Sequence, residues 1–417
     1  MGYTLAEKIL MHNTKSPDIK PGNLITADAD RVMIHDLFAP FVIEKFREMG
    51  FKRVWDPDRI VFVFDHLVPA STLDDNRHHH IAEAFAEEQG IEHIHRSDGV
   101  CHQLMPELRY ALPGNVIFGT DSHTTTYGAV GAFATGIGYT EMAAILGTGR
   151  LWLKVPETLK FNVEGKFPEG VFSKDLILRI IGDIKANGAT YKSMEFSGSA
   201  ISGLSVSARL TLSNMAVEAG AKVGLIEPDE KTFEYCGLPA AGYDYLKSDP
   251  DAEYERVYDY DAAKLEPVVA CPSNVDNIRN VGEAKGIKIN QAFLGSCTNG
   301  RADDLEIAAN ILRGRKIAPF IKLIVTPASR SVYLEAVNKG VISALIEAGA
   351  VVTQPSCGLC CGRSGGVVSD GERVIATNNR NFLGRMGSSK SEVYLASPAT
   401  VAASALTGEI TDPRNFL

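Results

Sequence analysis

Short apolar runs alternate with amphipathic helical stretches along most of the chain. The runs at 59–64 (RIVFVF) and 115–119 (NVIFG) have the length and the β-branched or aromatic content of buried strands. Strands that alternate with helices are typical of βαβ units, which build largely parallel sheets. The sequence therefore predicts an α/β fold.

Six apolar runs are each followed directly by polar or unusual residues, at the point where the predicted strand ends. In open α/β sheets, ligands bind outside the carboxyl ends of the strands. Six such placements together predict one composite active site. The runs are 59–64 before Asp65-His66, 115–119 before TDSHTTTYG (120–128), 288–295 before SCTNGRADD (296–304), 350–354 before the cysteine-rich stretch 357–361, 372–377 before NNRNFLGR (378–385), and 392–396 before a helix that begins at Ser-Pro and ends at Gly408.

Changes in composition and in the pattern of apolar residues along the 417 residues predict three α/β domains. The first domain, 1–155, carries the Asp and His motifs and ends near a shift in composition at 152–165. The second domain, 156–285, includes a polar, tyrosine-rich excursion at 242–262 without clear apolar periodicity. The third domain, 286–417, carries the clustered cysteines and two arginines.

Composition narrows the function classes. The net charge of −9 and the lack of a basic run argue against a nucleic-acid partner. No apolar stretch reaches 18 residues, and the N-terminus lacks a signal-peptide pattern, so no membrane partner is expected. An odd number of cysteines, seven, suggests a reducing compartment, and we expect a cytoplasmic protein. The RHHH run at 77–80 is expected at a solvated helix start.

Three cysteines are candidate metal ligands. Cys357 and Cys360 form a C-x2-C pair, a spacing shared by zinc, iron–sulfur and redox sites. A structural zinc site normally has a second ligand pair, which is missing here. Cys297, in GSCTNG at another predicted strand end, supplies a third thiolate, although a small buried residue is the alternative. Three thiolates would leave a metal centre with an open position for a substrate hydroxyl.

Acid–base groups gather in the N-terminal half. Histidine carries protons near neutral pH, and a carboxylate partner fixes its tautomer and raises its pKa. Arg380 and Arg385 flank NFLG after a predicted strand, where guanidinium groups suit a substrate that carries carboxylates. The candidate acid–base residues are Asp65, His66, His102, Asp121, His123 and Glu218.

Several motifs, taken in chain order, resemble the aconitase superfamily over essentially the whole chain. Within it, the chain is most similar to the large subunits of isopropylmalate dehydratases and the related homoaconitases. The matching motifs are GVCHQLMPE (99–107), DSHTTTYGAVGAFATGIG (121–138), SNMAVEAGA (213–221), GSCTNGRADDL (295–305), the C-x2-C pair and NNRNFLGRMG (378–387).

The resemblance implies three α/β domains around a [4Fe–4S] cluster held by Cys297, Cys357 and Cys360, with one open-coordination iron. It pairs Asp65 with His66, Asp121 with His102, and Glu218 with His123. It also places a set of residues around the substrate: His35, Ser122, Asn214, Asn379, Arg380 and Arg385.

The same resemblance implies a heterodimer or heterotetramer. Full-length aconitases carry a fourth, mobile domain that supplies a serine base and another arginine, and here the family motifs end with the chain. A separate small subunit would supply that domain. The activity implied is a hydro-lyase of leucine biosynthesis, which isomerises 2-isopropylmalate and 3-isopropylmalate through isopropylmaleate.

Alternatives remain at this level. Homoaconitate or 2,3-dimethylmalate would suit the same chemistry, and the stretch CGRSGG (361–366) departs from the Leu-Gly-His-Met pattern of many relatives, which leaves the substrate open. An RNA-binding protein regulated by cluster loss and a zinc-stabilised scaffold are alternatives from other classes. Neither a basic patch nor a second ligand pair supports them.

Overall fold

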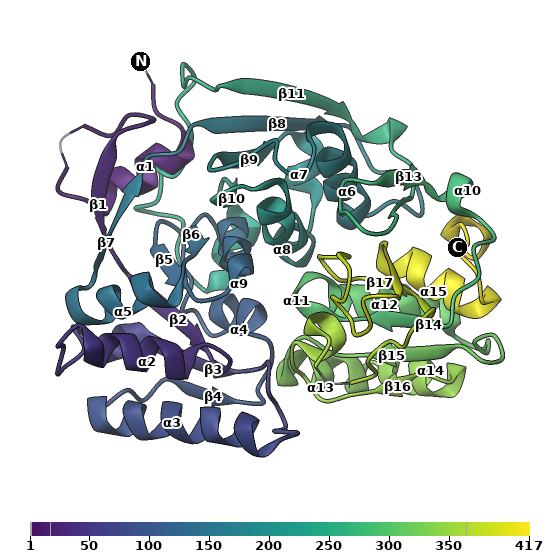
Figure 1. The fold of residues 1–417 in the computed structure, drawn as a ribbon. Helices are drawn as coiled ribbons and strands as arrows, with labels where there is room; N and C mark the ends of the chain where they lie inside the picture. Colours follow the sequence, from purple (N-terminus) through teal and green to yellow (C-terminus); the bar gives the residue numbers. More distant parts are fainter. Residues whose placement is uncertain (1, 17, 364) are drawn as a thin grey trace. The chain divides into compact units, whose positions relative to one another are not determined.

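The computed structural model describes residues 2–16, 18–363 and 365–417, which form two compact units (Figure 1). Each unit is assembled from three separate segments of the chain. The three-domain division at 155 and 285 stays a prediction. Unit 1 is Met1–Arg96, Leu104–Glu164 and Ala189–Tyr260, and unit 2 is Ser97–Gln103, Gly165–Gly188 and Asp261–Leu417.

A five-stranded parallel sheet forms the centre of unit 1. The chain builds outward from β2 through β3 to β4 on one side, and then from β5 to β6 on the other. The strand order therefore reverses between β2 and β5, and such a reversal opens a crevice at the carboxyl edge. In spatial order the strands are β4 (Ile94–Arg96), β3 (Ile60–Phe64), β2 (Arg31–His35), β5 (Val116–Gly119) and β6 (Phe133–Gly136).

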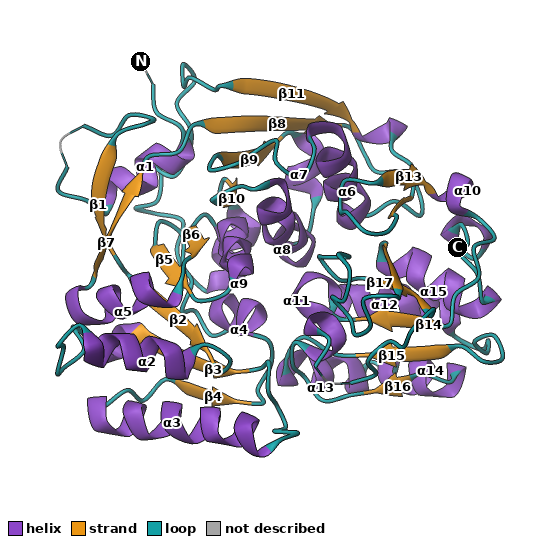
Figure 2. Cartoon of the chain, viewed as in Figure 1, coloured by secondary structure: helices purple, strands orange, loops and turns teal. Residues whose placement is uncertain are grey.

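Apolar residues explain why these strands lie inside. All five residues of β3, IVFVF, are buried, as expected for a parallel strand covered on both faces. Helix α2 (Ala39–Glu48) packs against α3 (Leu73–Gln89) and α5 (Tyr139–Thr148), and the three contribute to one core with the sheet (Figure 2). A capping box between Thr72 and Asp75 fixes the start of α3.

A second, four-stranded sheet of unit 1 has the order β10 (Val223–Ile226), β9 (Ser193–Ser197), β8 (Thr158–Glu164) and β11 (Arg256–Asp261). Strand β11 lies within the stretch that the sequence predicted to be an irregular excursion. As an edge strand it needs no apolar alternation, and the stacking of Tyr258 on Phe161 holds it to the sheet. The other elements of unit 1 are α1 (Leu5–His12), β1 (Leu24–Asp28), η1 (Pro57–Arg59), η2 (Ser122–Val130), β7 (Arg150–Lys154), α7 (Ser199–Gly203), α8 (Val206–Met215), η3 (Ala216–Ala219) and α9 (Glu230–Cys236).

Unit 2 repeats the reversal of strand order in a seven-stranded sheet. Five consecutive strands, from β18 to the edge strand β16, are parallel, and the order changes direction between β14 and β17. The order is β13 (Ile278–Asn280), β12 (Val268–Ala270), β18 (Glu392–Leu395), β17 (Arg373–Ala376), β14 (Gln291–Leu294), β15 (Lys322–Val325) and β16 (Val351–Val352). The helices are α6 (Ser173–Ile184), α10 (Val281–Ala284), α11 (Ser296–Asn299), α12 (Ala302–Leu312), α13 (Arg330–Asn338), α14 (Val341–Ala348) and α15 (Pro398–Thr407), while α4 (Cys101–Glu107) crosses the boundary between the units.

The structure confirms the α/β class and a strand in each of the six apolar runs. The seven-stranded sheet is mixed, because β12 runs antiparallel to β13 and β18. Helix α15 begins after Ser397 and ends before Gly408, as predicted. No helix in the described part of the chain has the length and apolar character to cross a bilayer.

Gly128 sets the approach of η2 to β10. A Cβ at this position would lie 1.9 Å from the carbonyl oxygen of Gly224, which is backbone and cannot rotate away. We expect Gly128→Ala to lower the free energy of unfolding of unit 1 by about 1–3 kcal/mol. Denaturant unfolding followed by tryptophan fluorescence measures this, since Trp55 and Trp152 both lie in unit 1.

Gly203→Ala is the matched control, because a Cβ there meets nothing within 4 Å. An unchanged midpoint for Gly128→Ala would contradict the close backbone approach.

Candidate functional site

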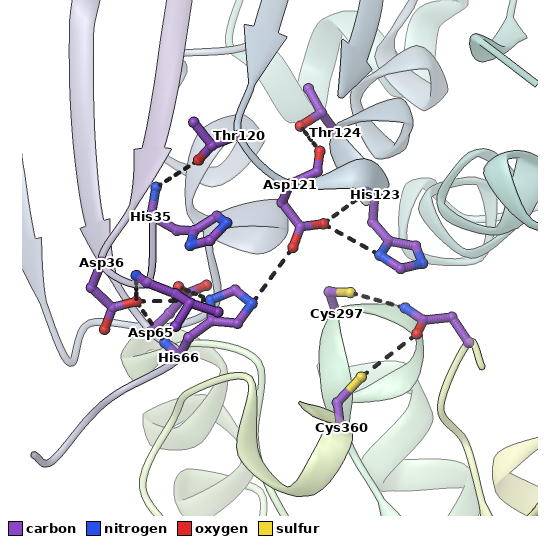
Figure 3. Close-up of polar contacts among 12 residues, drawn as sticks. His35, Asp36, Asp65, His66, Thr120, Asp121, His123, Thr124, Cys297 and Cys360 are labelled. Atoms are coloured by element: carbon purple, nitrogen blue, oxygen red, sulfur yellow. Dashed lines mark hydrogen bonds and ion pairs between the residues drawn. The ribbon is translucent and has the colours of Figure 1, made fainter. Parts of the chain in front are cut away.

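Three adjacent strands of unit 1 place acid–base groups at their carboxyl ends (Figure 3). His35 is the last residue of β2, Asp65 and His66 follow β3, and Asp121 follows β5 after one residue. The Nδ1 of His66 lies 2.6 Å from Asp65 Oδ1, and its Nε2 lies 3.5 Å from Asp121 Oδ2. The predicted Asp65–His66 pair is thus in contact, and Asp121 joins it.

Asp36 is a functional candidate that the sequence reasoning missed. It is fully buried, and its two carboxylate oxygens accept the backbone N–H groups of His66 (3.1 Å) and Leu67 (2.9 Å). His79 approaches Asp36 Oδ2 through Nε2 at 3.2 Å and stacks on Phe64. Asp36 therefore holds the backbone on which His66 is carried. Asp36 could have been found from the sequence, because it directly follows the strand β2 and therefore lies at the carboxyl edge of the sheet.

His79 also corrects the expectation for the RHHH run. The run does lie in the first half of α3, but the His79 side chain is only 13% exposed. Burial alone would raise the pKa of Asp36, yet the hydrogen bond from His79 and the nearby His66 and His35 rings hold it below its ordinary value.

His35 lies beside His66 as a neutral ring. The two ring centroids are 4.4 Å apart, and the His35 side chain is buried. Burial, with the neighbouring His66 as the next cause, lowers the pKa of His35 to about 4. Among the described residues, its buried Nδ1 has no hydrogen-bond partner. A buried imidazole of this kind can give or accept a hydrogen bond without carrying charge.

A second acid–base pair, His123 with Glu218, lies at η2, which follows β5. Asp121 caps η2 by accepting the backbone N–H of His123 at 2.7 Å. His123 Nε2 lies 2.7 Å from Glu218 Oε1, which is the contact predicted for these two residues. Asn214 Nδ2 donates to Thr126 Oγ1 at 2.8 Å, so the predicted substrate residue Asn214 packs beside η2. Ser122 is the first residue of η2, and its role stays a prediction.

The three predicted cysteine ligands all lie at the carboxyl edge of the unit 2 sheet. Cys297 is in α11 after β14, and Cys357 and Cys360 are in the turn after β16. All three are buried, and every cysteine of the chain is a free thiol. Hydrogen bonds that Cys357 shares with Cys360 and Cys361, together with burial, raise its pKa well above the ordinary value. The sulfurs of Cys357, Cys360 and Cys361 therefore lie close to one another.

The loop after β17 supplies groups that contact these sulfurs. Asn379 Nδ2 donates to Cys297 Sγ at 3.4 Å, and Cys360 Sγ donates to Asn379 Oδ1 at 3.6 Å. An Nη of Arg385 lies 3.3 Å from Cys360 Sγ. Burial opposes the charge of Arg385, but the Cys360 and Cys357 sulfurs raise its pKa above the ordinary value. Arg380 lies in the same loop.

Two further buried groups in unit 2 were missed. Arg301 is 1% exposed and donates to the carbonyls of Cys297 (2.7 Å) and Thr298 (2.8 Å), so it fixes the turn that carries Cys297. Asn378 is fully buried, and neither amide atom has a hydrogen-bond partner among the described residues. An unpaired buried amide is costly, which marks Asn378 as a group available to a ligand.

His102 belongs to unit 2 and Asp121 to unit 1, so the predicted Asp121–His102 pair stays a prediction. In the stretch 361–366, Ser364 lies outside the described residues.

Two sets of side chains have the donor atoms for a metal. His35, Asp36 and His66 each offer one atom within 4.8 Å of the others. Both oxygens of Asp36 already accept backbone N–H groups, so a cation there would have to displace them. The second set is Cys297, Cys357 and Cys360, and thiolates are the ligands of iron–sulfur clusters.

Comparisons with known proteins show the family to which the chain belongs. The profile of the aconitase family (aconitate hydratase) matches residues 7–408. The chain is 51% identical over 419 residues to a 3-isopropylmalate dehydratase large subunit 1 of Methanopyrus kandleri, with 100% of both chains covered. It is 50% identical over 392 residues to a probable methanogen homoaconitase large subunit of Methanosarcina mazei, covering 94% of this chain and 100% of that one.

Among solved structures, aconitase X of Thermococcus kodakaraensis is similar in fold, with a TM-score of 0.52 at 11% sequence identity. The similarity covers 85% of this chain and 84% of that one.

The low pKa of His35 predicts a pH effect on stability. Between pH 6.5 and about 4 the unfolded chain binds a proton that the folded chain excludes, so stability is lost as the pH falls through this window. Between pH 7 and pH 4 the unfolding free energy of the wild type should fall by roughly 3 kcal/mol because of His35 alone. The His35→Gln variant should lack this part of the fall. Denaturant titrations followed by tryptophan fluorescence across that range measure it.

His80→Gln, at an exposed position of α3, serves as the control and should follow the wild type. An equally steep pH dependence in His35→Gln would show that His35 is not excluded from protonation.

Proposed function

Because the chain belongs to the aconitase family, we propose that it is the large, catalytic subunit of a 3-isopropylmalate dehydratase. The reaction is the interconversion of 2-isopropylmalate and 3-isopropylmalate through isopropylmaleate, in leucine biosynthesis. The observation that carries this proposal is the set of three buried cysteines beside Arg385, in a chain that matches dehydratase large subunits over its full length.

In this proposal Cys297, Cys357 and Cys360 hold a [4Fe–4S] cluster. Their chemistry fits, since three thiols converge at one sheet edge and an Asn379 amide and an Arg385 guanidinium contact their sulfurs. The N–H that Asn379 donates to Cys297 Sγ and the cationic Arg385 beside Cys360 Sγ would stabilise anionic sulfur ligands. When bound through three cysteines, the cluster supplies one Lewis-acidic iron with an open position for a substrate hydroxyl.

Arg380 and Arg385 bind the substrate carboxylates. The guanidinium of Arg385 is partly buried and the nearby cysteine sulfurs raise its pKa above the ordinary value, which suits a bidentate contact with a carboxylate. Asn379 and the unpaired Asn378 add amide donors in the same loop. These groups would orient the substrate and stabilise the negative charge that develops on its carboxylate during elimination.

His66 is the proposed acid for the departing hydroxyl. Its ring lies near three carboxylates, with Asp65 at 2.6 Å, Asp121 at 3.5 Å and Asp36 at 3.9 Å. An imidazole held among carboxylates can give a proton to a leaving oxygen and take it back on rehydration. His123, paired with Glu218, is a second proposed proton carrier. His102 stays a candidate from the sequence.

The chain would act with a separate small subunit. The relatives it matches over their full length are named large subunits. In this proposal the small subunit supplies the base that removes the carbon-bound proton, and the assembly is a heterodimer or heterotetramer. The cytoplasmic location and the three-domain division stay predictions.

A homoaconitase is a second candidate, because a probable homoaconitase large subunit is about as similar as the dehydratases are. The two functions differ in the alkene that is hydrated. The deciding experiment is anaerobic purification with the small-subunit gene co-expressed, followed by hydration assays on isopropylmaleate, citraconate, dimethylmaleate and homoaconitate. Strong preference for isopropylmaleate supports the proposal. Preference for homoaconitate would replace it with the second candidate, and iron without hydration of any alkene would refute both.

Loss of one cysteine should abolish cluster binding without unfolding the chain. The α/β cores are built from apolar residues and do not include the metal centre. We expect Cys357→Ser to bind almost no iron and sulfide while its circular dichroism stays that of the wild type. Cys271→Ser, a buried cysteine outside the proposed ligand set, should keep its iron. Full iron content in Cys357→Ser would remove this residue from the ligand set.

Arg385→Lys should reduce kcat/KM by about 10- to 100-fold, because an ammonium cannot reproduce the bidentate guanidinium contact and one charged hydrogen bond is worth roughly 1.5–3 kcal/mol. Steady-state kinetics of the assembled enzyme measure the effect. Arg373→Lys is the control, since Arg373 is an exposed arginine on β17 that pairs with Glu392. Near-normal turnover in Arg385→Lys would exclude Arg385 from substrate binding.

A further inference from the structure

Lys174 is a charged side chain with 0% exposure in unit 2. Lysine is almost never fully buried unless its ammonium is paired. Here Nζ donates to the carbonyl oxygens of Thr377 (2.7 Å) and Asn378 (2.6 Å). Lys174 is the second residue of α6, so a helix from a distant part of the sequence holds the turn that follows β17.

Thr377 and Asn379, the first and last residues of the 377–379 turn, both link it to the region of the cysteines. The Thr377 hydroxyl accepts the backbone N–H of Gly295 at 2.9 Å and donates to its carbonyl at 3.0 Å, two residues before Cys297. Asn379, next along the turn, contacts the sulfurs of both Cys297 and Cys360. A shift of the carbonyls held by Lys174 would therefore move the amide that meets two of the three proposed ligands.

The neighbouring Asp175 fixes Lys174 in place. Its carboxylate accepts the backbone N–H groups of Val268 (3.0 Å) and Phe172 (2.9 Å) and a hydrogen bond from Ser397. The first turn of α6 is thus anchored to β12 and to the start of α15. Burial raises the pKa of Asp175 to about 7.

We propose that Lys174 is a positioning residue for the metal centre: it fixes the 377–379 turn so that Asn379 meets Cys297 and Cys360, and its buried charge favours the reduced form of the cluster. This inference rests on the proposed function for the cluster itself. Hydrogen bonds to cluster sulfurs and nearby charge are the levers by which a protein sets a cluster's reduction potential. A structural lysine without this role would leave that potential unchanged.

The test compares Lys174→Met, which keeps the length without charge or donors, with Lys174→Gln, which keeps an amide donor without charge. Lys185→Met is the matched control, because Lys185 caps the other end of α6, is exposed, and also donates to a carbonyl. Redox titration followed by electron paramagnetic resonance should show the one-electron reduction of Lys174→Met disfavoured about tenfold, ~59 mV to lower potential. Lys174→Gln should shift in the same direction, and Lys185→Met should match the wild type.

A second readout uses the iron-free protein. Alkylation of Cys297 and Cys360 by iodoacetamide, followed by mass spectrometry, should be at least about threefold faster in Lys174→Met, since Asn379 no longer shields both sulfurs. Failure of the wild type to bind iron would overturn the proposed function and the redox half of this inference, while the alkylation rates would still decide the positioning half. Unchanged potential and unchanged alkylation in a folded Lys174→Met or Lys174→Gln would overturn the inference.

Discussion

The carboxyl edge of a parallel sheet, at the point where strand order reverses, is the constraint on which both units depend. The chain leaves the sheet in opposite directions there, so the loops diverge and side chains can converge without a covering helix. In unit 1 this occurs between β2 and β5, and it gathers His35, Asp65, His66 and Asp121. In unit 2 it occurs between β14 and β17, with Cys297 and Asn379 at the two strand ends.

Buried charges make these edges rigid. Asp36 holds the backbone of His66, Arg301 holds the carbonyls around Cys297, and Lys174 holds the turn before Asn379. None of the three needs to touch substrate. Each buried charged side chain forms hydrogen bonds to backbone groups in place of the water that it has lost. Removing one partner from such a site leaves the other group unsatisfied, which is why positioning residues can matter as much as the groups they hold.

The strand ends were predictable because a buried parallel strand is a short apolar run, and each run pointed to the residues after it. The Asp65–His66 contact was predictable because the two residues are adjacent in the sequence. The nearness of Cys357 to Cys360 was predictable because they form a short C-x2-C motif. What lay beyond prediction was long-range: His79 reaches Asp36 across 43 positions, and Lys174 reaches Thr377 across 203. Strand β11 was missed because an exposed edge strand carries little apolar signal.

The central claim is that three cysteines of this chain hold a cluster with an iron open to substrate. The most direct measurement is electron paramagnetic resonance of the reduced, anaerobically assembled enzyme before and after addition of 2-isopropylmalate. The account predicts that substrate changes the g-values of the cluster signal, and that hydroxyl labelled with oxygen-17 broadens it. An iron–sulfur signal that substrate leaves unaltered would contradict the claim.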